Sequence, residues 1–406
     1  MPRKILLLVF CILLIATNCC AKRGDLLTSN WYENKTYSRF EIETLFESAL
    51  SSKFVRNWAK GIMGSAKNSV RGYQITYVSI NHSGKEIPVS GMILVPELPV
   101  QQRAPLLVYQ HATIFKNSAA PSFLDYSNQG KALLSTFATR GYIVALADYV
   151  GMGQITDYPV EYLYAASEAA NGVDIIPATE QLLTKLGRTT NGQLFLSGYS
   201  AGGQAASAMG RLIQNSYPEY NITAMALMEG PYDMTAEMEY LLKPGGVEIG
   251  GLAAGSVIGA KAIYSYKNIY QWGSLSDIFK EPYAQCVQKD FSELNPNILL
   301  DSLDFKADTA LMLQPAFIDS IRIGAAARDV AENNTDDWIP AMPLYLLTSK
   351  ADVLIPAQIT EKTYSKMKES GGNVHLVYIP FLFDHSKNFM PSIVASWKIF
   401  SRFSLK

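Results

Sequence analysis

The sequence lacks several features that mark particular classes of protein. Only four of its 406 residues are cysteine, too few to predict a disulfide framework. Neither sign of charge is in excess, because 35 Lys and Arg stand against 36 Asp and Glu. Since no basic stripe is visible either, we predict no nucleic-acid partner. Internal repeats and low-complexity runs are also missing.

The apolar run near the N-terminus is too short to cross a membrane. It covers residues 5–15, follows Arg3 and Lys4, and precedes small and polar residues. A membrane-spanning helix needs about 20 apolar residues. A positive start, a short apolar stretch and a small, polar end are typical of a secretory signal peptide. We therefore predict that residues 1–20 are a signal peptide and that the protein is exported, either secreted or periplasmic.

Two adjacent cysteines, Cys19 and Cys20, stand where such a peptide would be cleaved. Bacterial lipoproteins carry a lipidated cysteine at this point, although Asn18 is an unusual residue to precede one. Lipidation at Cys19 or Cys20 would associate the protein with a membrane. An unmodified N-terminus is the alternative.

Short apolar runs recur along the chain between stretches of helical periodicity. Hydrophobic residues form 48% of the chain, enough to fill a large core. Apolar runs bounded by turn residues predict strands, and apolar residues repeating every three or four positions predict helices. The predicted strands are 73–80, 87–95, 105–110, 142–147, 193–196, 222–228, 343–347 and 374–379. The predicted helices are 37–64, 128–139, 172–186, 201–214 and 391–403.

The order of these elements predicts an α/β fold with a mostly parallel, eight-stranded sheet and helices on both of its faces. No short apolar strands recur between residues 234 and 340, where Gly-rich and helical stretches stand instead. We interpret this interval as a helical cap inserted after the sixth strand. The chain then divides into an N-terminal helical arm (21–70), a first core part (71–233), the cap or lid (234–340) and a second core part (341–406).

One motif carries the chemistry. Gly198-Tyr199-Ser200-Ala201-Gly202 fits the pattern G-x-S-x-G, follows an apolar strand and opens a helix rich in small residues. This is the setting of a nucleophile elbow, where glycines give a tight turn the space it needs. Ser200 is therefore the candidate nucleophile. A glycine-rich turn without chemistry is the alternative.

A serine nucleophile needs a base, and the chain has only four histidines. His82 lies in an early hairpin turn and His111 precedes the nucleophile. His375 lies within the last strand, whereas His385 lies in a predicted loop after that strand. Because the order along the chain in α/β hydrolases is serine, acid, histidine, His385 is the candidate base.

The acid is expected after the strand that follows the cap. Asp352 lies five residues beyond that strand and would hold the tautomer of His385 and stabilise the imidazolium. A solvated loop carboxylate is the alternative interpretation of Asp352. Glu229, after the sixth strand, is the second candidate acid. We expect no role for Asp384, since neighbouring residues in an extended loop point in different directions.

The oxyanion hole requires two backbone N–H donors. One is expected from Ala201, the residue after the nucleophile. The other is expected from the loop after the third strand, from Ala112 or Thr113. The ring of His111 is expected to brace that loop rather than to take part in catalysis.

Four segments of the chain resemble the α/β-hydrolase superfamily, in the branch of secretory lipases and bacterial lipase-like esterases. The resemblance runs from about residue 73 to the end. It implies an α/β-hydrolase fold with a cap, acting on acyl esters without a metal or a cofactor. One departure is Ala112, where related proteins often have glycine. The four segments are 90–96, 109–111, 148–153 and 198–203.

These observations favour a serine hydrolase that cleaves carboxylic esters, a carboxylesterase or lipase, through an acyl-enzyme on Ser200. The expected substrate is a small acyl ester or a lipid, and the expected state is a monomer. A serine peptidase of the same fold and a noncatalytic binding protein are the alternatives. Apolar residues of the cap form either an acyl pocket or the cap's own core. These residues are Leu241, Leu242, Val257, Ile258, Ile263 and Tyr264.

Overall fold

The structure is a computed structural model that describes residues 21–50, 52–243, 247–248, 254–291 and 308–405. The predicted signal peptide, with Cys19 and Cys20, lies outside the described residues. Within those residues, no helix has both the length and the apolar character that crossing a bilayer would require.

Nine strands form one sheet in the order β1-β2-β3-β5-β4-β6-β7-β8-β9. Its first three neighbouring pairs are antiparallel and the remaining five are parallel. The mostly parallel sheet that the sequence predicted is therefore confirmed, with nine strands in place of eight. The strands are β1 (Leu26–Tyr37), β2 (Val70–Ile80), β3 (Glu86–Pro96), β4 (Ala104–Gln110), β5 (Ile143–Ala147), β6 (Thr190–Tyr199), β7 (Ile222–Met228), β8 (Leu344–Thr348) and β9 (Val374–Tyr378).

The additional strand is β1, in the segment predicted as a helical arm. It is an edge strand that pairs only with β2, and Tyr32 and Tyr37 are its only buried residues. Because most of its side chains face solvent, the strand lacks the apolar alternation that the prediction relied on. The single helix predicted over 37–64 is instead two helices, α1 (Arg39–Ser48) and α2 (Lys53–Met63).

Helices cover both faces of the sheet. Helices α4 (Ala165–Lys185), α5 (Ala201–Ser216) and α13 (Ala357–Glu369) pack in one hydrophobic core, on one face. Helices α3 (Asn128–Thr136) and α14 (His385–Phe400) join α1 and α2 in the core on the other face. This arrangement agrees with the predicted layers.

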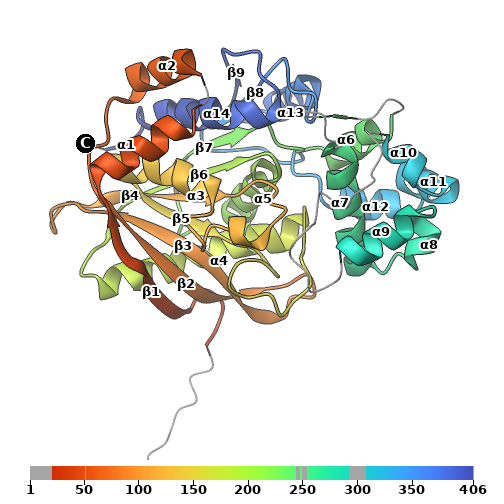
Figure 1. Cartoon of the computed structure of the whole chain (residues 1–406), viewed down its shortest axis with the longest axis horizontal. Helices are drawn as coiled ribbons and strands as arrows, with labels where there is room; N and C mark the ends of the chain where they lie inside the picture. The colour runs from red at the N-terminus through yellow and green to blue at the C-terminus, as the bar shows by residue number, and fades with distance from the viewer. Residues whose placement is uncertain (1–20, 51, 244–246, 249–253, 292–307, 406) are drawn as a thin grey trace, which may run out of the picture.

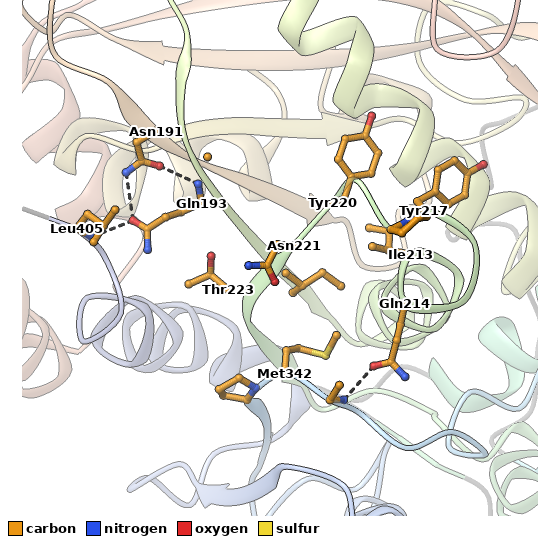
Figure 2. Close-up of a pocket in the computed structure, with 15 residues that line it drawn as sticks. Asn191, Gln193, Ile213, Gln214, Tyr217, Tyr220, Asn221, Thr223, Met342 and Leu405 are labelled. Carbon is orange, nitrogen blue, oxygen red and sulfur yellow. Dashed lines mark hydrogen bonds between the residues drawn. The ribbon is translucent and has the colours of Figure 1, made fainter.

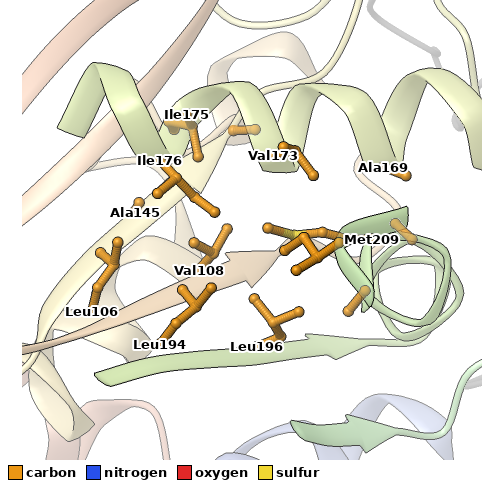
Figure 3. Close-up of a cluster of buried hydrophobic side chains, with 14 of the residues drawn as sticks. Leu106, Val108, Ala145, Ala169, Val173, Ile175, Ile176, Leu194, Leu196 and Met209 are labelled. Carbon is orange, nitrogen blue, oxygen red and sulfur yellow. The ribbon is translucent and has the colours of Figure 1, made fainter. Parts of the chain in front are cut away.

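The alternation of side chains along the central strands produces these two cores. In the β4–β6 ladder, Leu106 lies beside Leu194 and Val108 beside Leu196. All four point toward the layer of α4 and α5, where Met209 meets them (Figure 3). Their neighbours in the sequence point to the opposite face, because successive residues of a strand alternate between faces. Both faces of these strands are therefore buried.

The interval that was predicted to be a cap contains seven helices among its described residues. It follows β7, the sixth of the predicted strands, and its helices gather at one side of the sheet (Figure 1). Most of the apolar residues named above pack in a core of these helices, and Ala201 belongs to the same cluster. The helices are α6 (Met234–Leu241), α7 (Ala254–Tyr270), α8 (Leu275–Ile278), α9 (Tyr283–Asp290), α10 (Thr309–Met312), α11 (Pro315–Ile323) and α12 (Ala325–Ala331).

The last helix begins earlier than predicted. Residues 391–403 were expected to be helical, but α14 starts at His385 and runs through Pro391. A proline usually marks the first turn of a helix, which explains the misplaced boundary. Asp384 caps the helix by accepting the N–H of Lys387. His385 is therefore held in the first turn of a helix and not in a loop, and Asp384 does have a structural role.

Candidate active site

Ser200 occupies a strained turn between β6 and α5. Its φ of 57° and ψ of −125° lie outside the regions that non-glycine residues normally adopt. Such a conformation costs about 1–3 kcal/mol and persists only where the surroundings impose it. Here the Ser200 N–H donates to the Met228 carbonyl at 2.8 Å, and the Ser200 carbonyl accepts from Gly203 at 2.8 Å. Ser200 is 7% exposed.

The two glycines of the motif are required by contacts between backbones. A Cβ atom at Gly198 would lie 1.9 Å from the Gly202 carbonyl oxygen. A Cβ atom at Gly202 would lie 2.0 Å from the Gln110 carbonyl oxygen at the end of β4. Neither neighbour can move easily because both are main chain. The contacts confirm that this turn is the close-packed elbow that the sequence predicted.

His385 and Asp352 form a hydrogen-bonded pair. The Nδ1 atom of His385 lies 2.7 Å from Oδ2 of Asp352. The second carboxylate oxygen of Asp352 accepts the N–H groups of Leu354 and Ile355, each at 2.9 Å. Asp352 is thus held in one orientation in the turn after β8, and it is 5% exposed. It is not the solvated loop carboxylate that was the alternative.

The pair changes the acid–base properties of His385. Burial disfavours the imidazolium, but the charge and hydrogen bond of Asp352 outweigh this effect and raise the pKa of His385 above its ordinary 6.5. The other ring nitrogen, Nε2, is buried and has no hydrogen-bond partner among the described residues. It is therefore available to a proton donor.

Parallel strands bring these residues to one edge of the sheet. Ser200, Asp352 and His385 follow β6, β8 and β9, whose carboxyl ends lie side by side. Contacts of Tyr199, the residue before Ser200, show that His385 lies close to the elbow. Its ring centroid is 5.2 Å from that of His385, and its hydroxyl contacts the main-chain oxygen of His385.

A second carboxyl group lies beside His385. Glu229, which follows β7, is fully buried and has Oε2 3.8 Å from the Nδ1 atom of His385. The ligand atoms of Glu229, Asp352 and His385 lie within 4.8 Å of one another, so these three could hold a metal ion. Since Nδ1 and both oxygens of Asp352 are already engaged in hydrogen bonds, the arrangement is explained without an ion.

The loop after β4 lies beside the elbow. The Ala112 N–H donates to Oε1 of Gln129 at 2.7 Å, so it is occupied and does not fit the predicted oxyanion donor. Thr113 remains as the candidate in this loop. Its hydroxyl is 2.5 Å from that of Tyr162. The N–H of Ala201 begins α5, where N–H groups have no acceptor within the helix.

Lys261 is a residue of this region that the sequence reasoning missed. It comes from α7, is fully buried, and donates from Nζ to the Ile114 carbonyl at 2.8 Å. The ammonium also lies 4.5 Å from the centroid of the Tyr162 ring. Burial lowers the pKa of Lys261 to about 8. In the sequence, a single lysine among the mostly apolar residues of 254–264 could have indicated this buried residue.

The other three histidines have structural surroundings. His111 stacks on Tyr149 and contacts the Ala112 carbonyl with Nδ1 at 2.7 Å, so it braces the loop as expected. Burial lowers the pKa of His111 to about 4. His82 pairs with Glu161 at the hairpin turn. His375 is exposed on β9, where it stacks on a tyrosine ring.

An open groove of about 770 Å³ lies at the end of the sheet where the parallel strands β6 and β7 begin (Figure 2). It is lined by residues that begin β6 and β7, such as Asn191, Gln193 and Asn221, and by Tyr217 and Tyr220. Because Ser200 follows the far end of β6, this groove is separate from the elbow. It does not belong to the site described above.

The comparisons with known proteins agree with this geometry. The model of the secretory lipase family matches residues 127–398. The chain belongs to the secretory lipase family. It is 24% identical over 311 residues to the secreted triacylglycerol lipase LIP5 of Malassezia furfur, covering 74% of each chain. The rice cell wall degrading esterase LipA of Xanthomonas oryzae superposes with a TM-score of 0.81 at 26% identity, covering 94% of this chain and all of that one.

Family membership decides between the three functions left open by the sequence. This protein is a carboxylic ester hydrolase with the α/β-hydrolase fold, so neither the peptidase nor the noncatalytic alternative is needed. Its substrates are esters or lipids, and it is exported, as the N-terminal pattern predicted.

The contact between Gly202 and Gln110 generates a prediction. Gly202→Ala should lower the free energy of unfolding by about 1–3 kcal/mol, because the new methyl group overlaps main chain that cannot give way. Ester hydrolysis should fall with it. Gly61→Ala is the matched control, since a Cβ atom at Gly61 in α2 meets nothing within 4 Å. Denaturation in urea measures both variants, and equal stability of G202A and the wild type would contradict the argument.

Proposed function

We propose that this lipase cleaves carboxylic esters through an acyl-enzyme on Ser200, with His385 as base and Asp352 as the acid that orients it. The observation that carries the proposal is the His385–Asp352 hydrogen bond beside a strained serine elbow. It leaves Nε2 of His385 as the free ring nitrogen. A base with one nitrogen held and the other free is the arrangement that activates a serine hydroxyl.

In the first half of the reaction, Ser200 Oγ attacks the ester carbonyl carbon while Nε2 of His385 takes the hydroxyl proton. The tetrahedral intermediate collapses, and the imidazolium gives that proton to the departing alkoxide. The acyl group is then esterified to Ser200. In the second half, His385 takes a proton from water, which attacks the acyl-enzyme. The carboxylic acid leaves and the serine is restored.

The negative charge that forms on the carbonyl oxygen needs N–H donors. We assign these to Ala201, at the start of α5, and to Thr113, since the Ala112 N–H is occupied by Gln129. The hydroxyl of Thr113 contacts Tyr162, and Lys261 of α7 donates to the adjoining carbonyl of Ile114. The helices of residues 234–340 would then act as a cap over the site.

Replacing the proposed residues tests the assignment. Ser200→Ala should lower kcat by about 10⁴-fold or more, and Asp352→Asn by about 10²–10⁴-fold, because the asparagine cannot hold the required tautomer. Turnover of short p-nitrophenyl esters measures both effects, and labelling by a fluorophosphonate should be lost in S200A. Labelling elsewhere, or full activity of S200A, would refute the role of Ser200. His375→Ala is the matched control, because that ring is exposed on β9.

The raised pKa of His385 predicts how activity depends on pH. Only the neutral imidazole can accept the serine proton, so kcat/KM should fall as the pH drops through the pKa of His385 in the folded protein. Because Asp352 raises that pKa, the midpoint of the fall should lie above 6.5. In D352N the residual activity should have its midpoint at a lower pH. A midpoint unchanged by D352N would show that Asp352 does not act on His385.

We also propose that the exported chain is anchored by lipidation at Cys19 or Cys20, which the sequence pattern alone supports. Expression in a bacterial host, followed by partition into detergent, should place the wild type in the membrane fraction. Replacing both cysteines by serine should release the activity into the soluble fraction. If the wild type is released to the same extent, the chain is exported without a lipid anchor.

A further inference from the structure

We propose that Glu229 is a positioning residue held as a neutral carboxylic acid, which donates its proton to Tyr199 so that Tyr199 can donate to the main chain of His385. The inference rests on the proposed function, in which Asp352 is the ionised acid and His385 the base. It concerns a residue that the mechanism above does not use.

Glu229 has contacts that account for both of its oxygens. Oε2 lies 2.5 Å from the hydroxyl oxygen of Tyr199, and Oε1 accepts from the hydroxyl of Ser392 at 3.2 Å. The same Tyr199 hydroxyl contacts the main-chain oxygen of His385. Tyr199 therefore joins Glu229 to the first residue of α14.

The number of hydrogens decides how this chain of contacts works. A phenol has one hydrogen to donate, and a carbonyl oxygen has none. If Glu229 were ionised, Tyr199 could donate to Glu229 or to His385 but not to both, and one pair of oxygens would face each other without a hydrogen. If Glu229 is protonated on Oε2, it donates to Tyr199, and Tyr199 donates to the His385 carbonyl. Only the protonated form satisfies both contacts.

The distribution of charge leads to the same result. The titratable groups that face Glu229 are Tyr199, Tyr232, Asp352 and His385. Asp352 already accepts the Nδ1 hydrogen of His385 at 2.7 Å, whereas Glu229 lies 3.8 Å from the same nitrogen. A second negative charge would therefore be buried beside the first without a cation of its own. Burial and the charge of Asp352 accordingly raise the pKa of Glu229 above its ordinary range, although His385 opposes them.

The position of this carboxyl group explains what it does. The Glu229 N–H donates to the Leu347 carbonyl at 2.9 Å, which fixes the backbone, and the residue has a φ of 49°. Tyr199 directly precedes Ser200, and His385 carries the base. Glu229 thus ties the main chain beside the nucleophile to the main chain of the base. A displacement of about 1 Å at such a site lowers the rate by about 10²-fold.

Four variants test the inference. Glu229→Gln keeps a donor for Tyr199 and an acceptor for Ser392, so we expect kcat to stay within about threefold of the wild type. Glu229→Ala and Tyr199→Phe each break the chain of contacts, so we expect kcat to fall by about 10–10²-fold, with KM changing much less. Asp352→Asn should fall by about 10²–10⁴-fold and is the reference for losing the ionised acid.

Three further measurements separate positioning from a general loss of structure. Thermal melts identify any variant that is not folded, and Y199F retains the size and the carboxyl group of the site if E229A does not fold. The infrared spectrum at neutral pH should contain a protonated-carboxyl band that is missing from the E229Q spectrum. At alkaline pH the wild type should lose activity as Glu229 gives up its proton, and E229Q should lose less.

The outcomes are distinguishable. If E229Q falls as far as D352N, Glu229 is an ionised acid and the inference is wrong, while the role of Ser200 stands. Glu229 has no neutral positioning role if E229A and Y199F both have the kcat of the wild type. The same conclusion follows if the E229Q spectrum contains every protonated-carboxyl band of the wild type. If D352N is as active as the wild type, the proposed function itself fails, and the result for E229Q cannot be taken as support.

Discussion

The left-handed turn at Ser200 exists because two main-chain segments approach more closely than side chains would permit. Gly202 lies against the carbonyl of Gln110, and Gly198 lies against Gly202. This packing brings the start of α5 to the end of β4, which places the N–H of Ala201 beside the loop that carries Thr113. The proposed nucleophile, the proposed oxyanion donors and the residues of 234–340 that pack with Ala201 all depend on that approach.

Around His385, the two carboxyl groups of Asp352 and Glu229 are buried next to one imidazole. Asp352 receives three hydrogen bonds and suits a negative charge. Glu229 receives a hydroxyl from Ser392 and shares Tyr199 with the His385 carbonyl, which suits a neutral acid. Different hydrogen-bond donors thus give two similar side chains different charges. The charge and hydrogen bond of Asp352 raise the pKa of His385 against the effect of burial.

Much of the fold could be predicted because both faces of most strands are buried and their apolar runs are visible in the sequence. The edge strand β1 could not, since its exposed residues carry no alternation and it is stabilised by pairing with β2. The start of α14 was misplaced because Pro391 resembles a first-turn proline, whereas Asp384 caps the helix seven residues before the predicted start. Pairing with a distant strand decided the first case, and a local cap upstream of Pro391 decided the second.

For the site, the sequence by itself determined Ser200, Asp352 and His385 as candidates, because the elbow is a local pattern and the order of the three along the chain leaves few alternatives. Only the tertiary structure decided the rest. Gln129 occupies the Ala112 N–H, and Lys261 reaches the Ile114 carbonyl from 147 positions away. The protonation of Glu229 depends likewise on hydroxyl and carbonyl groups contributed by other elements. Hydrogen-bond partners and buried charges are set by residues far apart in the chain, so a local sequence pattern does not predict them.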